Sequence, residues 1–259
     1  IKVKKIVPRL HFGKKLNRIA AAISLLLIVS GIGYYFFSSN KSLNRETIVQ
    51  TYSTITGKSK FILPDGSEVW LNSHSKLEYK NLHADMREVE LKGEAFFKVQ
   101  HDERPFIVKP SDIAVKVHGT QFNVSAYHAD EKSVVSLYEG SVSMHVLGDD
   151  SSNCYLKPGE EGSLDKKDKT IRVEKGDVEF AKMWTNEKVK LENKNLHEVC
   201  KYLSKWYNVK IIIDPALSDD QSYTFTLHDQ SLEDIIRIMS NISSINYHFT
   251  EDNTLMITL

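Results

Sequence analysis

The feature that most constrains this chain is an uncharged run of nineteen residues, Ile19 to Phe37, with the sequence IAAAISLLLIVSGIGYYFF. At about 1.5 Å per helical residue this run reaches about 28 Å, close to the hydrocarbon thickness of a bilayer. Its aromatic end, YYFF, suits the membrane interface. We therefore predict one transmembrane helix at residues 19–37, with these side chains in the membrane: Ile19, Leu25, Leu26, Leu27, Ile28, Val29, Ile32 and Phe37.

The charge of the chain is unevenly distributed. Residues 1–18 contain seven basic residues and no acidic one, whereas the whole chain has 34 of each sign, so the remainder carries a net charge of −7. The positive-inside rule then predicts a cytoplasmic juxtamembrane segment at residues 1–18, with membrane lipid as a partner and the bulk of the chain outside. A mildly acidic exterior argues against nucleic acid as a partner.

Two other interpretations of the apolar run remain open. A cleaved signal peptide shares the basic start, and Gly31-Ile32-Gly33 is a small-x-small cleavage site, but the run continues past it. A buried core helix is the second alternative, although this run is apolar on every face. Because the chain begins with Ile1 rather than Met, we expect a cytoplasmic domain ahead of it.

After a polar linker at residues 38–47, the pattern from 48 to 178 changes to short runs of period two. Apolar and polar residues alternate in 141–146, in 87–91 and in 122–126, so each run is expected to bury one face. Between two such runs, Pro64-Asp65-Gly66-Ser67 is typical of a turn. We predict an all-β domain at residues 48–178, a sandwich or solenoid-like arrangement of many short strands.

Residues 179–259 combine helical and strand periodicity. Asn195 and Ser231 each precede an amphipathic helix, and a shift of 36 residues places the apolar positions of the first helix and its flanking strands on those of the second. We therefore predict a small α+β domain of two tandem β-α-β units, with two helices against one sheet. Its last strand is predicted to offer an uncovered edge for a partner strand, through Leu255, Met256, Ile257, Thr258 and Leu259. The alternative is that it is an inner strand.

The sequence contains few candidates for catalytic or metal-binding residues. The ten histidines and two cysteines lack metal-ligand spacing, and the chain has no glycine-rich phosphate loop, so no metal or cofactor is expected. Glu94, Asp102 and Glu103 are candidate paired carboxylates, but in a β-rich chain such neighbours are expected to face solvent. The tryptophans are expected in the core rather than as sugar-binding platforms. We predict that the chain is not an enzyme.

Several motifs, in this order, resemble those of the FecR family, the membrane-spanning anti-sigma regulators of bacterial cell-surface signalling. They run from Leu63-Pro64-Asp65-Gly66-Ser67 through Leu91 to Val99 (LKGEAFFKV) and Gly119 to Val124 (GTQFNV) to Leu156-Lys157-Pro158-Gly159-Glu160. The C-terminal part resembles the small secretin/TonB short N-terminal-like domain of Bacteroidetes-type members. The resemblance assigns structural roles to Pro64, Asp65, Gly66, Gly93, Glu94, Phe96, Phe97, Gly119, Thr120, Phe122, Asn123, Pro158 and Gly159.

The resemblance implies a function and two protein partners. Such regulators bind the N-terminal signalling domain of a TonB-dependent outer-membrane transducer in the periplasm. They hold or release an extracytoplasmic-function sigma factor through a cytoplasmic region, here expected ahead of Ile1. The implied location is the inner membrane, with a single pass, a cytoplasmic N-terminus and most of the chain in the periplasm.

Two other function classes remain as alternatives. A membrane-anchored envelope- or carbohydrate-binding module would use exposed aromatic side chains of the β-rich part. An anchored hydrolase would depend on Glu94 or Asp102.

Overall fold

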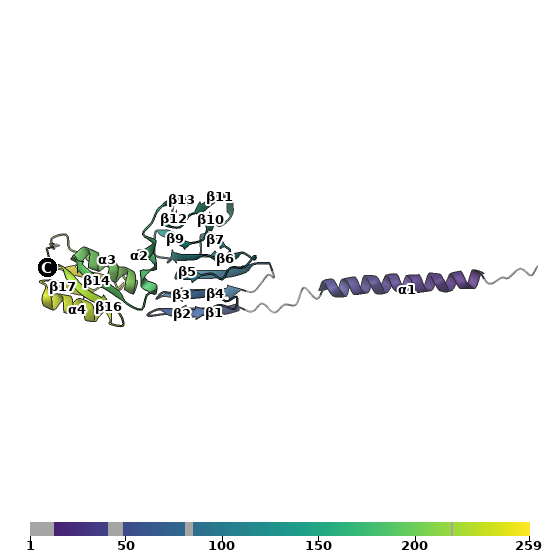
Figure 1. Cartoon of the computed structure of the whole chain (residues 1–259), viewed down its shortest axis with the longest axis horizontal. Helices are drawn as coiled ribbons and strands as arrows, with labels where there is room; N and C mark the ends of the chain where they lie inside the picture. Colours follow the sequence, from purple (N-terminus) through teal and green to yellow (C-terminus); the bar gives the residue numbers. More distant parts are fainter. Residues whose placement is uncertain (1–12, 41–48, 81–84, 219) are drawn as a thin grey trace, which may run out of the picture. The chain divides into compact units, whose positions relative to one another are not determined.

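The computed structural model describes residues 13–40, 49–80, 85–218 and 220–259. The chain separates into two units, Ile1–Thr47 and Ile48–Leu259, which are described in turn. In the first unit, Gly13–Asn40 form helix α1, the purple helix of Figure 1. Most of the predicted basic segment and of the predicted linker, residues 1–12 and 41–48, lies outside the described residues.

Helix α1 confirms the helical conformation predicted for residues 19–37. Large apolar side chains from Ile23 to Tyr35 are exposed on all of its faces. Within the described residues, no helix has the length and apolarity needed to cross a membrane. The described side chains of α1 cover residues 22–35, about 21 Å of helix. The transmembrane span is therefore not confirmed, and the side chains of Ile19 and Phe37 lie outside the described set.

The second unit begins with a β-rich part, which we call the body (residues 49–175). Its strands are β1 (Val49–Thr54), β2 (Ser59–Ile62), β3 (Glu68–Leu71), β4 (Ser75–Lys80), β5 (Arg87–Lys98), β6 (Phe106–Lys109), β7 (Ile113–Val117), β8 (Gln121–Ala126), β9 (Lys132–Glu139), β10 (Val142–Val146), β11 (Asp149–Leu156), β12 (Glu160–Asp165) and β13 (Ile171–Lys175). The prediction of many short strands is confirmed.

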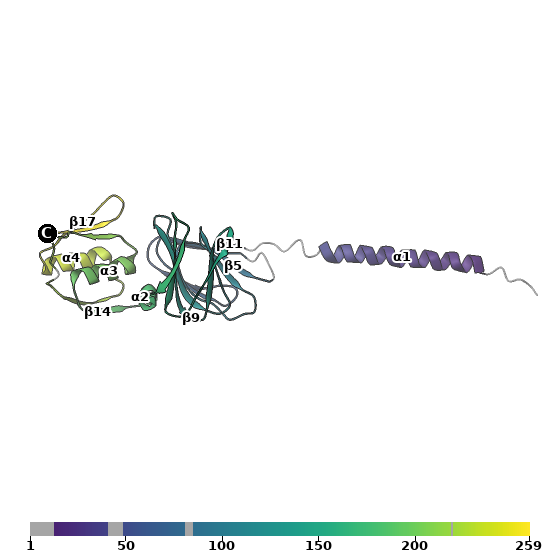
Figure 2. The same cartoon turned by 90° about the horizontal axis from the view of Figure 1, so that it is seen from above.

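The strands form two sheets that share β5. Their orders are β11-β10-β7-β6-β5-β4-β1 and β2-β3-β5-β8-β9-β12-β13. The sheets curve toward each other into a nearly closed barrel around one apolar core, and β11 approaches β12 and β13 at the far side (Figure 2). Of the two predicted arrangements, the structure is nearer to a sandwich than to a solenoid.

The long strand β5 changes sheet at Gly93. Its first half pairs with β4 and β6, and its second half, from Gly93 onward, pairs with β3 and β8. Gly93 has φ +93°, and a Cβ added there would overlap Ser75. Glycine is therefore required at the corner where one sheet passes into the other.

The predicted alternation holds in some strands and fails where polar side chains have buried partners. In β10, Val142 and Met144 are buried, as predicted. In β5, however, Arg87 and Glu88 are buried as well, and in β8 Asn123 is buried. The two-residue period does not reveal these positions, because their polar side chains bond segments that are distant in the sequence.

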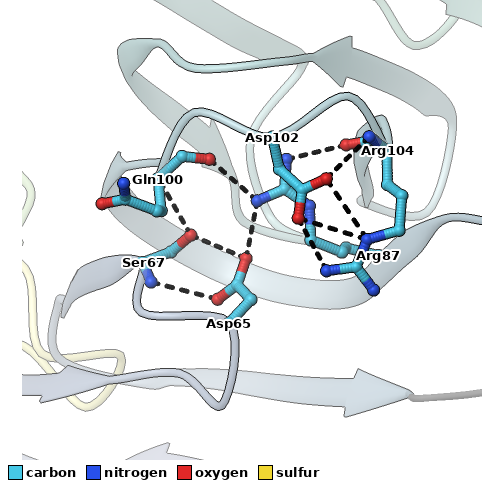
Figure 3. A network of polar contacts seen from close by, with 6 residues as sticks. All are labelled: Asp65, Ser67, Arg87, Gln100, Asp102 and Arg104. Atoms are coloured by element: carbon cyan, nitrogen blue, oxygen red, sulfur yellow. Dashed lines mark hydrogen bonds and ion pairs between the residues drawn. The ribbon is translucent and has the colours of Figure 1, made fainter.

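The predicted turn at residues 64–67 is confirmed and is tied to Arg87 (Figure 3). Ser67 N donates to Asp65 Oδ1 at 3.0 Å, and Asp65 Oδ2 lies 2.9 Å from Arg87 Nη1. Arg87 also donates to the carbonyl oxygens of Gln100 and Arg104, at 2.9 and 2.8 Å. The side chains of Arg87 and Asp65 are only 1% and 2% exposed. One guanidinium thus fastens the turn and the loop after β5 together.

The remainder of the second unit, residues 178–259, is called the C-terminal module. Its elements are α2 (Val178–Lys182), a 3₁₀ turn (Met183–Thr185), β14 (Val189–Lys194), α3 (Leu196–Tyr207), β15 (Ile211–Ile213), β16 (Tyr223–Leu227), α4 (Leu232–Ile242), β17 (Asn246–Phe249) and β18 (Leu255–Thr258). Asn195 and Glu198 form the predicted capping box of α3, and Ser231 caps α4. The two predicted β-α-β units are confirmed as β14-α3-β15 and β16-α4-β17.

The prediction of one sheet in the module is wrong. Strands β14 and β16 pair with each other, whereas β15, β18 and β17 form a second sheet in that order. The helices lie between the two sheets (Figure 2) and share one apolar core with them. Each unit therefore contributes its first strand to one sheet and its second strand to the other.

The prediction that residues 255–259 form an uncovered edge is also wrong. Strand β18 pairs with β15 on one side, in parallel, and with β17 on the other, antiparallel. Leu255 and Ile257 are fully buried in the module core. Since its backbone groups are used on both sides, β18 cannot accept a partner strand, and the inner-strand alternative is correct.

We expect replacement of Arg87 to be far more costly than replacement of the nearby Arg104. Arg87→Met leaves the Asp65 carboxylate buried without its cation, which should lower the free energy of unfolding by about 3–5 kcal/mol. Arg104 pairs with Asp102 at the surface, where its side chain is 44% exposed. Arg104→Met should therefore cost at most about 1 kcal/mol. Urea unfolding of a fragment of residues 48–259, a compact unit, measures both. Equal losses would contradict a special role for Arg87.

The module core gives a second prediction. Met239 on α4 is 1% exposed and Ile242 on the same helix is 67% exposed. Met239→Asp buries an unpaired charge and should unfold the module at ambient temperature, whereas Ile242→Asp should leave it folded. Hydrogen exchange in β16 and β18 reports the module, and exchange in β8 serves as the reference for the body. If both variants exchange like the parent, this assignment of the core is incorrect.

Candidate functional site

The two apolar cores of residues 48–259 are separate. The body core lies between its sheets and includes Phe97 and Phe122, and the module core surrounds α3 and α4 and includes Leu203. No residue belongs to both clusters. Body and module therefore need contacts of another kind where they meet.

Lysine side chains supply contacts between body and module, in what we call the junction. Lys205 of α3 forms an ion pair with Glu94 of β5. Two further lysines lie over aromatic rings of the other part, at distances typical of cation–π contacts. The three pairs are Lys205 with Glu94, Lys58 with Trp206 at 3.1 Å from the ring centroid, and Lys182 with Tyr138 at 3.5 Å.

Glu94 is the centre of a buried polar pocket. Its side chain is 2% exposed, and its Oε2 accepts a hydrogen bond from Asn72 Nδ2 at 2.8 Å. Its Oε1 accepts from Asn123 Nδ2 at 2.8 Å and from Lys205 Nζ at 2.5 Å. The prediction that Glu94 faces solvent is therefore wrong. A buried carboxylate persists only when it is paired and hydrogen-bonded, and both conditions are met here.

Local structure places this carboxylate. The bend at Gly93 turns β5 just before Glu94, and the Glu94 backbone N donates to Ser75 Oγ at 2.9 Å. Asn72 follows β3, and its own backbone N donates to the Glu94 carbonyl at 2.9 Å. Asn123 projects from β8 beside β5. The body alone thus orients the carboxylate and both amide donors.

The ionisable groups Tyr127 and Asp130 near Glu94 are partly buried. Burial raises the pKa of Tyr127 well above its ordinary value, and the charge of Glu94 raises it further. Burial also raises the pKa of Asp130, against the opposing effect of Lys166. In such an environment an ion pair is screened less than at the surface.

A cavity of about 390 Å³ lies at the junction, and Lys58, Ser73 and Trp206 are among its lining residues. Burial lowers the pKa of Lys58 to about 8, and Asp229 partly opposes this shift. Ser73 Oγ is a buried polar atom without a hydrogen-bond partner among the described residues. The junction is polar and incompletely packed, unlike either core.

The structure assigns most of the family-motif residues to turns and packing. Phe96, Phe97 and Phe122 are buried, and Pro64, Gly66, Pro158 and Gly159 lie in turns. A Cβ at Gly119 would approach His101 closely, and Thr120 Oγ1 donates to the Ser141 carbonyl at 3.0 Å. Of the family-motif residues, Glu94 and Asn123 are the two that meet in the buried polar pocket, and the bend at Gly93 positions Glu94.

Sequence reasoning missed three residues of the junction: Asn72 as an amide donor, Lys58 and Lys205. Lys205 lies 111 positions from Glu94, so no local pattern connects the two. The available signal was Glu94 itself, an acidic residue within an otherwise buried strand.

The other predicted carboxylates lie elsewhere. Asp102 binds Arg104 at 2.6 Å, and hydrogen bonds from that side chain hold the pKa of Asp102 below its usual range (Figure 3). Glu103 is exposed. Glu94 and Asp102 thus have different partners. Across residues 13–40, 49–80, 85–218 and 220–259, no group of three or more His, Cys, Asp or Glu side chains is placed to hold a metal ion.

Comparison with known proteins gives concordant results for both parts of the second unit. The model of the FecR protein family matches residues 50–143, and the model described as FecR, C-terminal matches residues 188–257. No curated protein matches the chain.

Similar solved structures include two crystal structures of a candidate anti-sigma factor from Parabacteroides distasonis, at 2.50 and 1.65 Å resolution. Each is 29% identical, with a TM-score of 0.58, over 81% of this chain and 98% of the other. The two family matches together cover most of the second unit, and the similar structures extend over both body and module. The chain therefore belongs to the FecR family of anti-sigma regulators.

Proposed function

We propose that this FecR-family protein regulates an extracytoplasmic-function sigma factor and relays to it a signal from a TonB-dependent outer-membrane transducer. Family membership and the similarity to a candidate anti-sigma factor support a sigma-factor regulator. The role of a TonB-dependent transducer is the more specific part of the proposal. The observation that carries it is a second compact module with its own core, joined to the body by polar contacts.

The proposed relay requires two states of the exterior part. A transducer shifts their balance only if it binds one state more tightly than the other. Body and module have separate cores, so a change at their junction leaves both folded. We propose that residues 48–178 and 179–259 act as distinct domains on this basis, with the module as the docking part and the body as the link to the membrane.

The tryptophans give little support to the envelope- or carbohydrate-binding alternative. Trp184 and Trp206 are buried, and the half-buried Trp70 lies under Lys60 at 4.4 Å. A sugar platform needs an accessible ring face. The hydrolase alternative depended on Glu94 or Asp102, and both carboxylates are held by cationic partners.

FecR proteins are membrane-anchored regulators. We propose that this chain is attached to the inner membrane as a single-pass protein, with a cytoplasmic N-terminus and residues 48–259 in the periplasm. The support is the exposed apolar surface of α1 and the basic segment that precedes it.

The attachment is tested by alkaline carbonate extraction. The full chain should remain with the membrane pellet, because carbonate releases proteins held only by charge, and a fragment of residues 48–259 should stay in the supernatant. Protease added to spheroplasts should cleave the exterior part and leave an N-terminal tag intact. Release of the full chain by carbonate, or loss of the tag, would contradict the proposal.

Docking is tested by titration with isolated N-terminal signalling domains of the host's TonB-dependent transducers, taken one by one. Residues 178–259 have their own core, so they are compared as a fragment with residues 48–259 and with residues 48–177. We expect the first two to bind one such domain with dissociation constants within about threefold, and the body alone to bind at least a hundredfold more weakly. Tight binding by the body alone would place the docking site outside the module.

A further inference from the structure

The proposed function assigns no role to the buried polar pocket around Glu94 at the junction. Among the described residues that bond the Glu94 carboxylate, the two amide donors belong to the body, as does the bend at Gly93, and Lys205 comes from the module. The body therefore presents a formed anionic pocket, whose remaining ligand is an ammonium group.

We propose that Glu94, Asn72 and Asn123 form a preorganised ammonium-binding pocket, that Lys205 occupies it, and that this occupancy holds the module against the body. The proposal concerns the closed arrangement of residues 48–259 and does not depend on which partner the protein binds.

Preorganisation follows from the bonds that fix the pocket without Lys205. Asn72 Oδ1 accepts from the Ser73 backbone N at 2.8 Å, which leaves its Nδ2 to face Glu94. Asn72 and Asn123 are 1% and 3% exposed in the closed arrangement, and Asn123 is further placed by the pairing of β8 with β5. We therefore expect the pocket to keep its shape when the lysine leaves, and preformed sites bind with little ordering cost.

The negative charge of the pocket explains why its ligand is an ammonium group. Glu94 is an acceptor, and Asp130 and Tyr127 are close enough for its charge to raise their pKa values. Without Lys205, closing the module over the pocket would bury the carboxylate with no compensating cation, so the closed arrangement would be unfavourable unless another cation entered.

Opening leaves both apolar cores intact. The two cores share no residue, and a cavity of about 390 Å³ is already present at the junction. The other cation contacts described there, Lys58 with Trp206 and Lys182 with Tyr138, are individually modest. Of these contacts, the buried ion pair at Glu94 is the one that we expect to hold the module closed.

The test removes the lysine and supplies a small ammonium ion instead. Lys205→Ala on α3 favours the helix, so the module should still fold. Lys201→Ala is the matched control, because Lys201 lies one turn earlier on α3 and contacts Phe180 within the module. Dyes are attached at E174C in the body and E233C in the module, in a C154S/C200A background of residues 48–259 whose melting temperature is checked first.

Single-molecule energy transfer between the two dyes then reports the open fraction, which is the share of molecules in which the module has moved away from the body. We expect Lys205→Ala to raise it at least tenfold and Lys201→Ala to leave it within twofold. Ethylammonium chloride at about 100 mM should close the Lys205→Ala protein, whereas sodium chloride or tetramethylammonium chloride at equal ionic strength should not, since neither donates hydrogen bonds.

Three results would overturn the proposal. An unchanged open fraction in Lys205→Ala would show that the ion pair does not hold the module. Opening that ethylammonium fails to reverse would show that the pocket is not preorganised for an ammonium group. If Lys205→Ala abolishes the cooperative unfolding of the module, the double variant Lys205→Met/Glu94→Gln is measured in its place. A closed state retained in the double variant would equally show that the ion pair does not hold the module. Loss of transducer binding alone would bear on the proposed function and not on this pocket.

Discussion

Strand β5 carries three buried charged side chains, Arg87, Glu88 and Glu94, and the architecture of residues 48–259 depends on how the first and the last are compensated. Arg87 at its start is satisfied by a turn and a loop of the body, and Glu94 beyond its bend by two amides and a lysine of the module. Because an unpaired buried charge costs several kcal/mol, these segments are held where the charges require them. One strand thereby joins two sheets and anchors a second core.

The sequence predicts well what hydrophobic periodicity alone determines. The helices α3 and α4, their caps and the strands of the tandem units follow the expected pattern, because Leu203 and Met239 have no alternative to burial. The turn at residues 64–67 was equally predictable from Asp65 and Gly66. The periodicity failed at Arg87, Glu94 and Asn123, since alternation distinguishes polar from apolar residues but says nothing about partners far away in the chain.

Strand order was the other quantity that periodicity could not supply. The pattern of Ile211, Tyr247 and Ile257 predicts which side chains face a core, but two sheets and one sheet bury them equally well. The same limit applies to the junction. Its lysines look like ordinary surface residues of helices and loops until the structure places Glu94, Trp206 and Tyr138 against them.

The central position of β18 in its sheet constrains the order in which the module can fold. Strands β14 and β16 can pair as soon as both have emerged into the compartment where the module folds, whereas β15 and β17 have no neighbour in their sheet until residues 255–258 follow. Until then α3 and α4 are covered on one side only, and the parallel pairing of β15 with β18 must close a long loop, which slows folding. As the chain emerges, the module therefore passes through an interval in which one side of its helices is open to a chaperone.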